Sequence, residues 1–355
     1  MRQGGRGRFP LTGVGRGSLP LTVVGSAPAA LAVALVLDAA LGEPPETVHP
    51  VVWMGRGVGA LVPPDRPGAG AATLMRGAAT AIGGVMLSAG AAGAVAAGIR
   101  RAPRPMRIAL DGVELWPLLA LRTLLRAAQR VAEALQDANL PRAREELRWL
   151  VGRDRSALDG GAVASAAVES VAENLADSVV APLLYARLAG PAGAAAHRFA
   201  NTADAMVGYR ERHRLGGRVA ARLDDALGLV PARATALLIA VAAPAGGGSL
   251  GGALRVWRRD GGATRSPNSG RPMAAMAGAL GVRLEKRGAH VLNAAARQPT
   301  AADVGRAVRI ARVATLLGLG ATAAAPAVGR RLAAGRAGRG RPVTTLTRRL
   351  ARGAA

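Results

Sequence analysis

Acidic side chains recur at helical spacing between residues 161 and 182. Glu169, Glu173 and Asp177 are four residues apart, so a helix would place them along one face. No Lys or Arg lies within this stretch to neutralise them. Carboxylates on so apolar a helix need a partner from elsewhere, such as a metal ion, a cationic substrate or an arginine. The alternative is an amphipathic surface helix with a hydrated acidic face. The polar half of the helix also contains Ser170, Asn174 and Ser178.

A second polar segment, residues 201–233, places carboxylates among basic side chains. Asp224 and Asp225 are adjacent. Such a pair suits hydrated Mg²⁺, which takes one or two carboxylates together with phosphate oxygens. Acids near a helix N-terminus are the alternative explanation, so the pair alone leaves both roles open. The other polar residues of interest here are Asn201, Asp204, Tyr209, Arg210 and Arg222.

The loop at residues 260–272 is rich in Gly, Ser, Asn and Pro, a composition that indicates turns. Backbone N–H groups beside Arg265 and Arg271 could hold a phosphate group. The loop is not a Walker P-loop, since GxxxxGK[ST] is absent, and no Rossmann GxGxxG follows a strand. We therefore expect anion binding here without either common nucleotide motif.

Two further candidate residues lie in turns. His49 is flanked by Pro44, Pro45 and Pro50, which prevent a continuous helix. Taken alone, such a histidine is more often structural than a ligand. Asp154 lies in the loop that leads into the acidic stretch.

The composition favours a membrane protein. Half of the 355 residues (50%) are hydrophobic, only 2% are aromatic, and the mean hydropathy is +0.22. Small residues, among them 48 Gly, allow the close helix–helix approach of membrane bundles. Cysteine is absent, which excludes disulfides, a thiol nucleophile and Cys-ligated metal clusters.

Apolar segments of roughly the length that crosses a bilayer recur along the chain. Residues 77–99 contain no charge and are the clearest candidate, while residues 21–37 have a signal peptide as their alternative. Residues 229–245 and 307–328 are also apolar, and charges interrupt 108–128. We predict an all-α, multi-pass integral membrane helical bundle in which polar loops carry the motifs.

The chain has a net charge of +25, and Lys286 is the only lysine among its 47 basic residues. Nucleic-acid binding would need a basic face or stacking aromatics. The arginines instead form blocks between apolar segments, as they do at the flanks of membrane helices. We expect no nucleic-acid partner. We predict a basic disordered extension at residues 1–20, one membrane-embedded domain at 21–330 and an Arg-rich tail at 331–355.

Six motifs follow one another along the chain. They are LDxxxGxP…HPVxxMG (Leu37 to Gly55), GRD (Gly152 to Asp154), AVESVAENxxDxVVAP (Ala167 to Pro182), NTxDAMVGYR (Asn201 to Arg210), AARLDDxxxxxPAR (Ala220 to Arg233) and SPNSG (Ser266 to Gly270). Together they resemble the CobD/CbiB family of cobalamin biosynthesis proteins over about residues 30–320. Any one motif is weak, but six in order are specific.

The resemblance implies the reaction of a membrane-bound adenosylcobinamide-phosphate synthase. Such an enzyme joins aminopropanol phosphate, or free aminopropanol, to the remaining propionate carboxyl of adenosylcobyric acid. ATP and Mg²⁺ are the implied cofactors, with the carboxyl activated before the amine attacks. The implied partners are the corrinoid and the amine, the lipid bilayer, and other enzymes of the late pathway.

The resemblance also implies roles for the residues that match its motifs. Asp177, Asp224 and Asp225 are expected to bind Mg²⁺. Arginine forks match phosphate oxygens, and we expect phosphate or substrate contacts from Arg210, Arg222, Arg265, Ser266, Asn268 and Gly270. The expected catalytic residues, one of which would deprotonate the amine, are His49, Asp154, Glu173, Asn174, Asp177 and Asp204. For Glu169 we keep a second interpretation open, in which it is a structural partner for an arginine.

Two other readings of the same sequence are a membrane carrier, with the acidic stripe as its path, and a non-catalytic scaffold of the late corrin pathway. The SPNSG and LDD motifs argue against a simple translocation path. The expected location is the cell membrane with the active site on the cytoplasmic side, where ATP is found. The basic residues 1–16 and 100–107 also favour the cytoplasm. Two spanning helices between them would place His49 outside, and the sequence leaves this conflict open.

Overall fold

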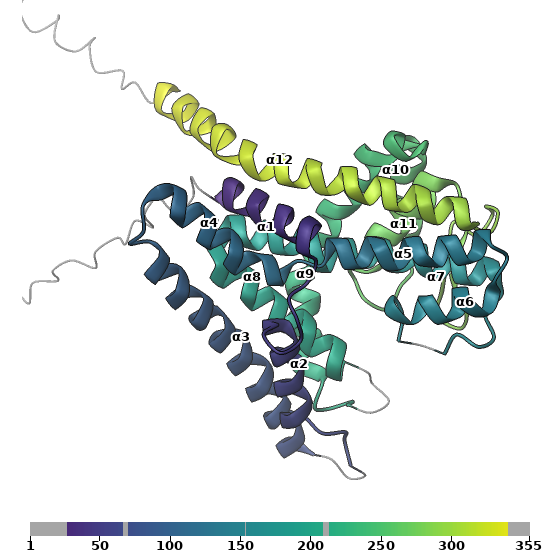
Figure 1. The fold of residues 1–355 in the computed structure, drawn as a ribbon, viewed down its shortest axis with the longest axis horizontal. Helices are drawn as coiled ribbons and strands as arrows, with labels where there is room; N and C mark the ends of the chain where they lie inside the picture. Colours follow the sequence, from purple (N-terminus) through teal and green to yellow (C-terminus); the bar gives the residue numbers. More distant parts are fainter. Residues whose placement is uncertain (1–26, 67–69, 153, 209–212, 340–355) are drawn as a thin grey trace, which may run out of the picture.

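The computed structural model describes residues 27–66, 70–152, 154–208 and 213–339, with side chains up to residue 324. The predicted extension at 1–20 lies outside the described residues. The helices are α1 (Ala27–Leu41), α2 (Pro50–Leu61), α3 (Ala71–Ile99), α4 (Arg104–Leu115), α5 (Leu121–Gln136), α6 (Leu140–Glu146), α7 (Gly160–Leu175), α8 (Ala181–Val207), α9 (Arg218–Ala242), α10 (Leu250–Asp260), α11 (Gly270–Leu280) and α12 (Ala301–Arg339) (Figure 1).

Short elements connect some of these helices. The predicted all-α bundle is confirmed, and the one sheet among the described residues is a two-stranded antiparallel hairpin that the sequence did not predict. Helix α12 continues across residue 331, the predicted start of the tail, and residues 340–355 are outside the described part. The short elements are η1 (Trp116–Leu118), η2 (Leu147–Trp149), η3 (Ala176–Val180), η4 (Ala243–Gly246), β1 (Leu284–Lys286) and β2 (His290–Leu292).

Four helical stretches are long and apolar enough to cross a membrane: Ala71–Ile99, Gly160–Val207, Arg218–Gly246 and Ala301–Ala324. The protein is therefore membrane-embedded. Helix α3 is the most exposed of them, since only 6% of its most apolar window is buried inside the protein. An apolar helix so little covered by protein is suited to contact with lipid.

The stretch Gly160–Val207 is not one straight helix, because α8 folds back on itself. Ala189 (φ −134°, ψ 16°) and Gly190 (φ 68°, ψ −164°) leave the helical conformation, and Pro191 begins the second limb. The rings of Tyr185 and His197 are consequently stacked with centroids 5.2 Å apart. Twelve residues would separate them by about 18 Å along a straight helix. The two limbs of α8 are thus an antiparallel helical hairpin.

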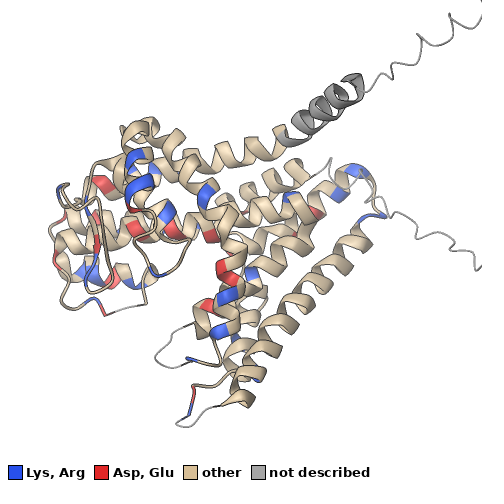
Figure 2. Cartoon of the chain, turned by 180° about the vertical axis from the view of Figure 1, so that it is seen from behind, with Lys and Arg blue, Asp and Glu red and all other residues tan. Residues whose placement is uncertain are grey.

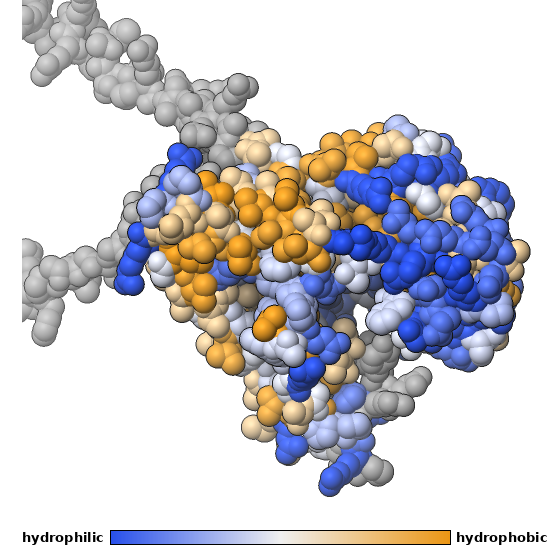
Figure 3. All heavy atoms as spheres, viewed as in Figure 1, coloured by the Kyte–Doolittle hydropathy of each residue, from blue (hydrophilic) through white to orange (hydrophobic). Residues whose placement is uncertain are grey.

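The molecule has a polar end and an apolar end. The start of α1, the end of α3 and the later turns of α12 lie at one end, whereas α5, α6, α7, α10 and α11 gather at the other (Figure 1). Charged residues are dense at the second end and in the centre, and sparse along α3 (Figure 2). An apolar surface covers α1 and α4, and hydrophilic residues cover the opposite end (Figure 3).

Helix α7 lies in the core, and its burial follows from its sequence of Ala, Val and Ser. Val163, Val168 and Leu175 are fully buried, and the side chains between them are small enough for neighbouring helices to approach closely. Asp159 begins the helix by accepting a hydrogen bond from the Ala162 N–H at 2.8 Å, a normal N-cap.

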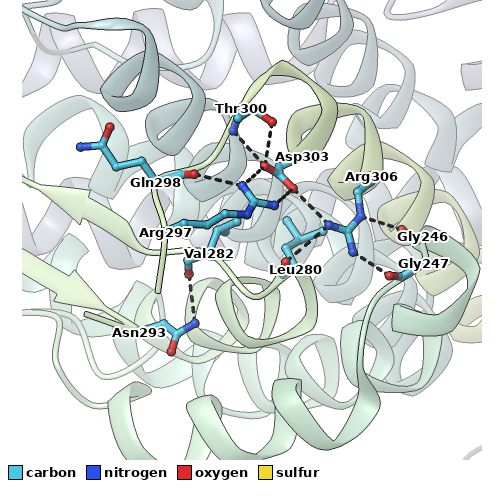
Figure 4. Close-up of polar contacts among 10 residues, drawn as sticks. All are labelled: Gly246, Gly247, Leu280, Val282, Asn293, Arg297, Gln298, Thr300, Asp303 and Arg306. Carbon is cyan, nitrogen blue, oxygen red and sulfur yellow. Dashed lines mark hydrogen bonds and ion pairs between the residues drawn. The ribbon is translucent and has the colours of Figure 1, made fainter. Parts of the chain in front are cut away.

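A buried carboxylate fixes the β1–β2 hairpin to the bundle (Figure 4). Asp303, 1% exposed at the start of α12, accepts two hydrogen bonds from Arg297 at 2.7 and 2.9 Å. It accepts a third from Arg306 at 3.1 Å, and Arg306 donates to the carbonyls of Gly246 and Gly247 at 3.0 and 2.6 Å. The segment after the hairpin is thereby tied to α12 and to the end of α9.

Candidate functional site

One turn of π-helix, η3, lies between α7 and α8 and carries Asp177. Its closing hydrogen bond runs from the Ala181 N–H to the Ala176 carbonyl, five residues back. Such turns change the direction of the side chains that follow, and they are common at functional sites. The acidic stripe is therefore not the regular helix that its spacing predicts.

Three carboxylates from different helices meet behind this turn, and we call Asp177, Asp204 and Asp224 the acidic wall. Asp177 feels the charge of Asp204, and Asp224 feels those of Asp177 and Asp204. Asn201 donates from Nδ2 to Asp224 Oδ1 at 3.3 Å. Like charges held this close repel one another, so the wall is a place where a bound cation would be stabilised.

Arg198 is a largely buried cation beside the wall. Its Nη1 donates to Ser178 Oγ at 2.9 Å and to Asn201 Oδ1 at 3.4 Å. Its charge acts on Asp177 and on Glu43, which lies in the turn before α2. Arg198 therefore connects the acidic wall to that first turn.

Glu43 and His49 form a pair within this first turn. His49 Nε2 lies 3.1 Å from Glu43 Oε2, and His49 Nδ1 accepts from the Val51 N–H at 3.2 Å as the N-cap of α2. Burial raises the pKa of the Glu43 carboxyl, but hydrogen bonds from His49 and Thr123 lower it more, so its pKa lies below the usual value. Both ring nitrogens of His49 thus have structural partners.

A cavity of about 390 Å³, which we call the small cavity, opens beside α7. Glu169 and Glu173 of α7, Lys286 and His290 of the hairpin and Arg265 are among its lining residues. Glu169 Oε1 lies 3.1 Å from His290 Nε2, and both side chains are more than nine-tenths buried. Glu173 in turn feels the charges of Lys286 and Asp224, so the small cavity adjoins the acidic wall.

A second and larger cavity of about 1040 Å³ lies on the other side of the loop between α10 and α11. Arg214, Arg218, Arg222 and Arg265 line it, together with Asp225. Arginine side chains in this number favour a ligand with several negative charges. We call it the basic cavity, and Arg265 lines both cavities.

The SPNSG loop is bonded to the LDD motif. Ser266 Oγ donates to Asp225 Oδ1 at 3.1 Å, and Asn268 Nδ2 donates to the Asp225 carbonyl at 2.7 Å. The Asn268 N–H is used by Ser266 Oγ and the Gly270 N–H by Thr264 Oγ1. These two N–H groups, which we expected to face a phosphate, thus hold the loop itself. The group of this loop that remains suited to an anion is the Arg265 side chain, which lines both cavities.

Comparison with known proteins identifies the family. The model of the CobD/Cbib protein family matches residues 31–319, most of the chain. The chain is 39% identical over 290 residues to the cobalamin biosynthesis protein CobD of Mycobacterium tuberculosis, covering 79% of this chain and 90% of that protein. The chain belongs to the CobD/CbiB family. No solved structure gives a significant match.

Other members of the family are similarly distant. The cobalamin biosynthesis protein CobD of Geobacter metallireducens is 40% identical over 266 residues, 72% of this chain and 80% of that protein. The probable cobalamin biosynthesis protein CobD of Methanothermobacter thermautotrophicus is 38% identical over 270 residues, 74% and 86% of the two chains. Membership places the protein in cobalamin biosynthesis, and the matched region contains every residue that the sequence nominated.

The CobD/CbiB motifs do not all converge. Asp154 lies in an exposed loop, where it accepts hydrogen bonds from the Ser156 N–H and Oγ, both at 3.0 Å. It lines a separate cavity away from the acidic wall. Asn174 Nδ2 donates to Ser170 of its own helix at 3.0 Å. Arg222 is exposed in the basic cavity, and Arg210 lies outside the described residues.

The acidic stripe is not a hydrated surface. Glu169 is 6% exposed and Ser170 is 4% exposed, so the surface-helix alternative is wrong for this face. Glu169 Oε1 is bonded by His290, and the alternative that Glu169 is a structural partner for an arginine stays a prediction.

Sequence reasoning missed three charged residues of this site: Arg198, Lys286 and His290. Arg198 is three residues before Asn201, on the same helix face, and that spacing was a usable signal. Lys286 and His290 follow α7 by more than a hundred residues and have no local motif, so only the fold shows their place.

The acidic wall fits Mg²⁺ in its donor chemistry. No group of three or more His, Asp or Glu side chains among the described residues could enclose a metal ion alone. Mg²⁺ normally keeps water and uses only one or two carboxylates with phosphate oxygens. Asp177 and Asp224, with a basic cavity nearby for phosphate, meet that requirement.

Proposed function

We propose that this protein forms an amide bond at the expense of ATP. It couples aminopropanol phosphate, or aminopropanol, to the remaining propionate of adenosylcobyric acid and yields adenosylcobinamide phosphate, or adenosylcobinamide. The carboxylate first takes the terminal phosphoryl group from ATP, and ADP leaves. The amine then attacks the acyl carbon, loses a proton and displaces phosphate. We also propose that these steps occur on the cytoplasmic side of the membrane.

One observation carries the proposal. The acidic wall, the mixed-charge small cavity and the arginine-lined basic cavity adjoin one another around a single loop. Phosphoryl transfer needs positive groups for the phosphates and a metal held by carboxylates. Amide formation also needs a place for an amine next to them. Family membership supports the same assignment.

The chemistry of each residue indicates its proposed role. Arg222 and Arg265 would hold phosphate oxygens, since guanidinium forks match them. Asp177 and Asp224 would hold Mg²⁺, which neutralises charge on the phosphates when bound. Arg198 keeps this wall in place through Ser178 and Asn201.

The decisive experiment is a coupled assay on membranes that contain the protein. Adenosylcobyric acid, aminopropanol phosphate, ATP and Mg²⁺ are supplied, and the amide product is measured by mass. We expect product from the wild type. Asp177→Asn and Asp224→Asn should each lower the rate by about 10²-fold or more, the usual effect of losing a preorganised charge.

The matched control is Asp137→Asn, since Asp137 is an exposed acid paired with Arg142 at 3.2 Å. This variant should keep the wild-type rate. Absence of product from the wild type, with an active relative as positive control, contradicts the proposal. Binding of the corrinoid without turnover would then favour the hypothesis of a non-catalytic scaffold. Movement of the corrinoid across the membrane would favour the hypothesis of a carrier.

A further inference from the structure

The small cavity carries both signs of charge on walls that come from distant parts of the chain. Glu169 and Glu173 on α7 supply the negative side, and Lys286 on the hairpin and Arg265 on the loop before α11 supply the positive side. A cavity of about 390 Å³ is near the lower limit of small-molecule sites, about 300 to 1,000 Å³. It is therefore suited to a small ligand that is itself dipolar.

The two glutamates of the cavity differ in their partners. Glu169 is bonded to His290 and is held in place by it. Among the residues that the structure describes, the Glu173 side chain forms no hydrogen bond or ion pair, although it faces the cavity. An ionised carboxylate in so enclosed a place requires a cation, and Glu173 is thus the group left to receive one.

Lys286 is the matching positive group. It is the only lysine in the chain, it lines the cavity, and its side chain forms no hydrogen bond or ion pair with any described residue. An ammonium on a flexible stem binds phosphate as a point charge and adjusts to the position of its ligand. A guanidinium, used at the other basic positions, presents a wider and more rigid fork.

The hairpin that carries Lys286 is anchored to α7, the helix that carries Glu173. The Glu285 N–H donates to Ser165 Oγ of α7 at 2.8 Å, and His290 is bonded to Glu169. Lys286 lies between these two attachments. The separation of the positive and negative sides of the cavity is therefore set by the fold.

We propose that the small cavity binds the amine substrate as a phosphorylated amino alcohol, with its ammonium at Glu173 and its phosphate at Lys286. This rests on the proposed function and extends it, since it gives the amine substrate a place in the fold and assigns one residue to each of its two charges. In the coupling step the bound ammonium loses a proton to the Glu173 carboxylate. The neutral amine then forms the C–N bond, and phosphate leaves the acyl carbon together with the second amine proton.

The test is a crossed binding experiment on the full-length protein in detergent, without ATP or corrinoid. Three probes are used: aminopropanol phosphate, propyl phosphate, which lacks the amine, and aminopropanol, which lacks the phosphate. Glu173→Gln should weaken the two amine-containing probes about tenfold and leave propyl phosphate unchanged. Lys286→Met should weaken the two phosphate-containing probes about tenfold and leave aminopropanol unchanged. Loss of one charge-assisted hydrogen bond has this size.

Arg287→Met is the matched control for Lys286→Met. Arg287 is the next residue, is exposed, and pairs with Asp159 outside the small cavity. The Arg287→Met variant should bind all three probes with the affinity of the wild type. Lys286→Arg should retain part of the phosphate affinity. Thermal unfolding of each variant shows whether it is folded.

The outcomes separate the binding site from the reaction. Variants that lose all three probes equally, or none, overturn the site, even if the wild type makes product. A crossed pattern in a wild type that makes no product keeps the site and overturns the reaction. If ATP competes with propyl phosphate for Lys286, the phosphate position belongs to the nucleotide and the site as proposed is wrong.

Discussion

At the scale of single residues, Arg198 explains how a bundle of apolar helices tolerates so many buried acids. Its charge acts on both Asp177 and Glu43, and its guanidinium donates hydrogen bonds to Ser178 and Asn201. Each carboxylate would be costly to bury alone. One cation shared among them reduces their repulsion and fixes their positions.

Replacing this cation should therefore affect both stability and activity. Arg198→Met leaves buried acids without their counter-charge, and we expect a loss of about 3 to 5 kcal/mol in the free energy of unfolding. The thermal unfolding midpoint in detergent measures it, and the coupled assay should show reduced turnover.

Arg142→Met provides the comparison, because Arg142 makes an exposed ion pair with Asp137. Such pairs contribute at most about 1 kcal/mol. Equal losses for Arg198→Met and Arg142→Met would show that the central position of Arg198 has no special effect.

At the scale of elements, glycine decides how closely α3 approaches its neighbours. A Cβ at Gly77 would overlap the backbone carbonyl of Gly216, in the loop before α9. Gly83, further along α3, has open space around it. The first glycine is therefore required by packing, whereas the second is required by nothing in the described structure.

The two positions give opposite predictions for the same substitution. Gly77→Ala should destabilise the protein by about 1 to 3 kcal/mol, as overpacking commonly does. Gly83→Ala should leave stability unchanged or raise it by up to about 1 kcal/mol, because alanine favours the helix. The thermal unfolding midpoints of the two variants measure the difference. Equal changes in the two midpoints would contradict the close contact between Gly77 and Gly216.

At the scale of the whole molecule, the start of α1 and the end of α3 lie at the apolar end, and neither helix reaches the polar end (Figure 1). The Arg100–Arg107 block joins α3 to α4 and lies at the same end as the start of α1, while α2, which follows His49, lies away from it (Figure 1). The conflict described above therefore persists. If the Arg100–Arg107 block were cytoplasmic, as its charge favours, His49 would lie on the other side of the membrane from ATP. The polar end carries many more charges (Figure 2), and we expect it to be cytoplasmic.

The absence of cysteine makes this orientation testable. Ala102→Cys marks the turn between α3 and α4, and Ala263→Cys marks the loop beside both cavities. A membrane-impermeant thiol reagent applied to whole cells should label position 102 and should label position 263 only after permeabilisation. Reversal of this pattern would place the acidic wall outside, and labelling of both from one side would contradict the spanning arrangement.

Local sequence determined much of this protein. Apolar length predicted α3 and the apolar parts of α9 and α12, because a bilayer requires about 20 apolar residues. Four-residue spacing predicted a functional role for Glu169, Glu173 and Asp177, which stays a prediction, and motif order identified the family. These properties depend on neighbours within one or two helical turns, and a sequence displays them directly.

Only the tertiary structure decided which charges meet. The fold-back at Gly190 brings Arg198 to Ser178, although twenty residues separate them along the chain. The hairpin brings Lys286 and His290 to α7 from more than a hundred residues away. Electrostatic interaction depends on distance in space and not on separation in sequence, so the acidic stripe acquired its partners only when the helices packed.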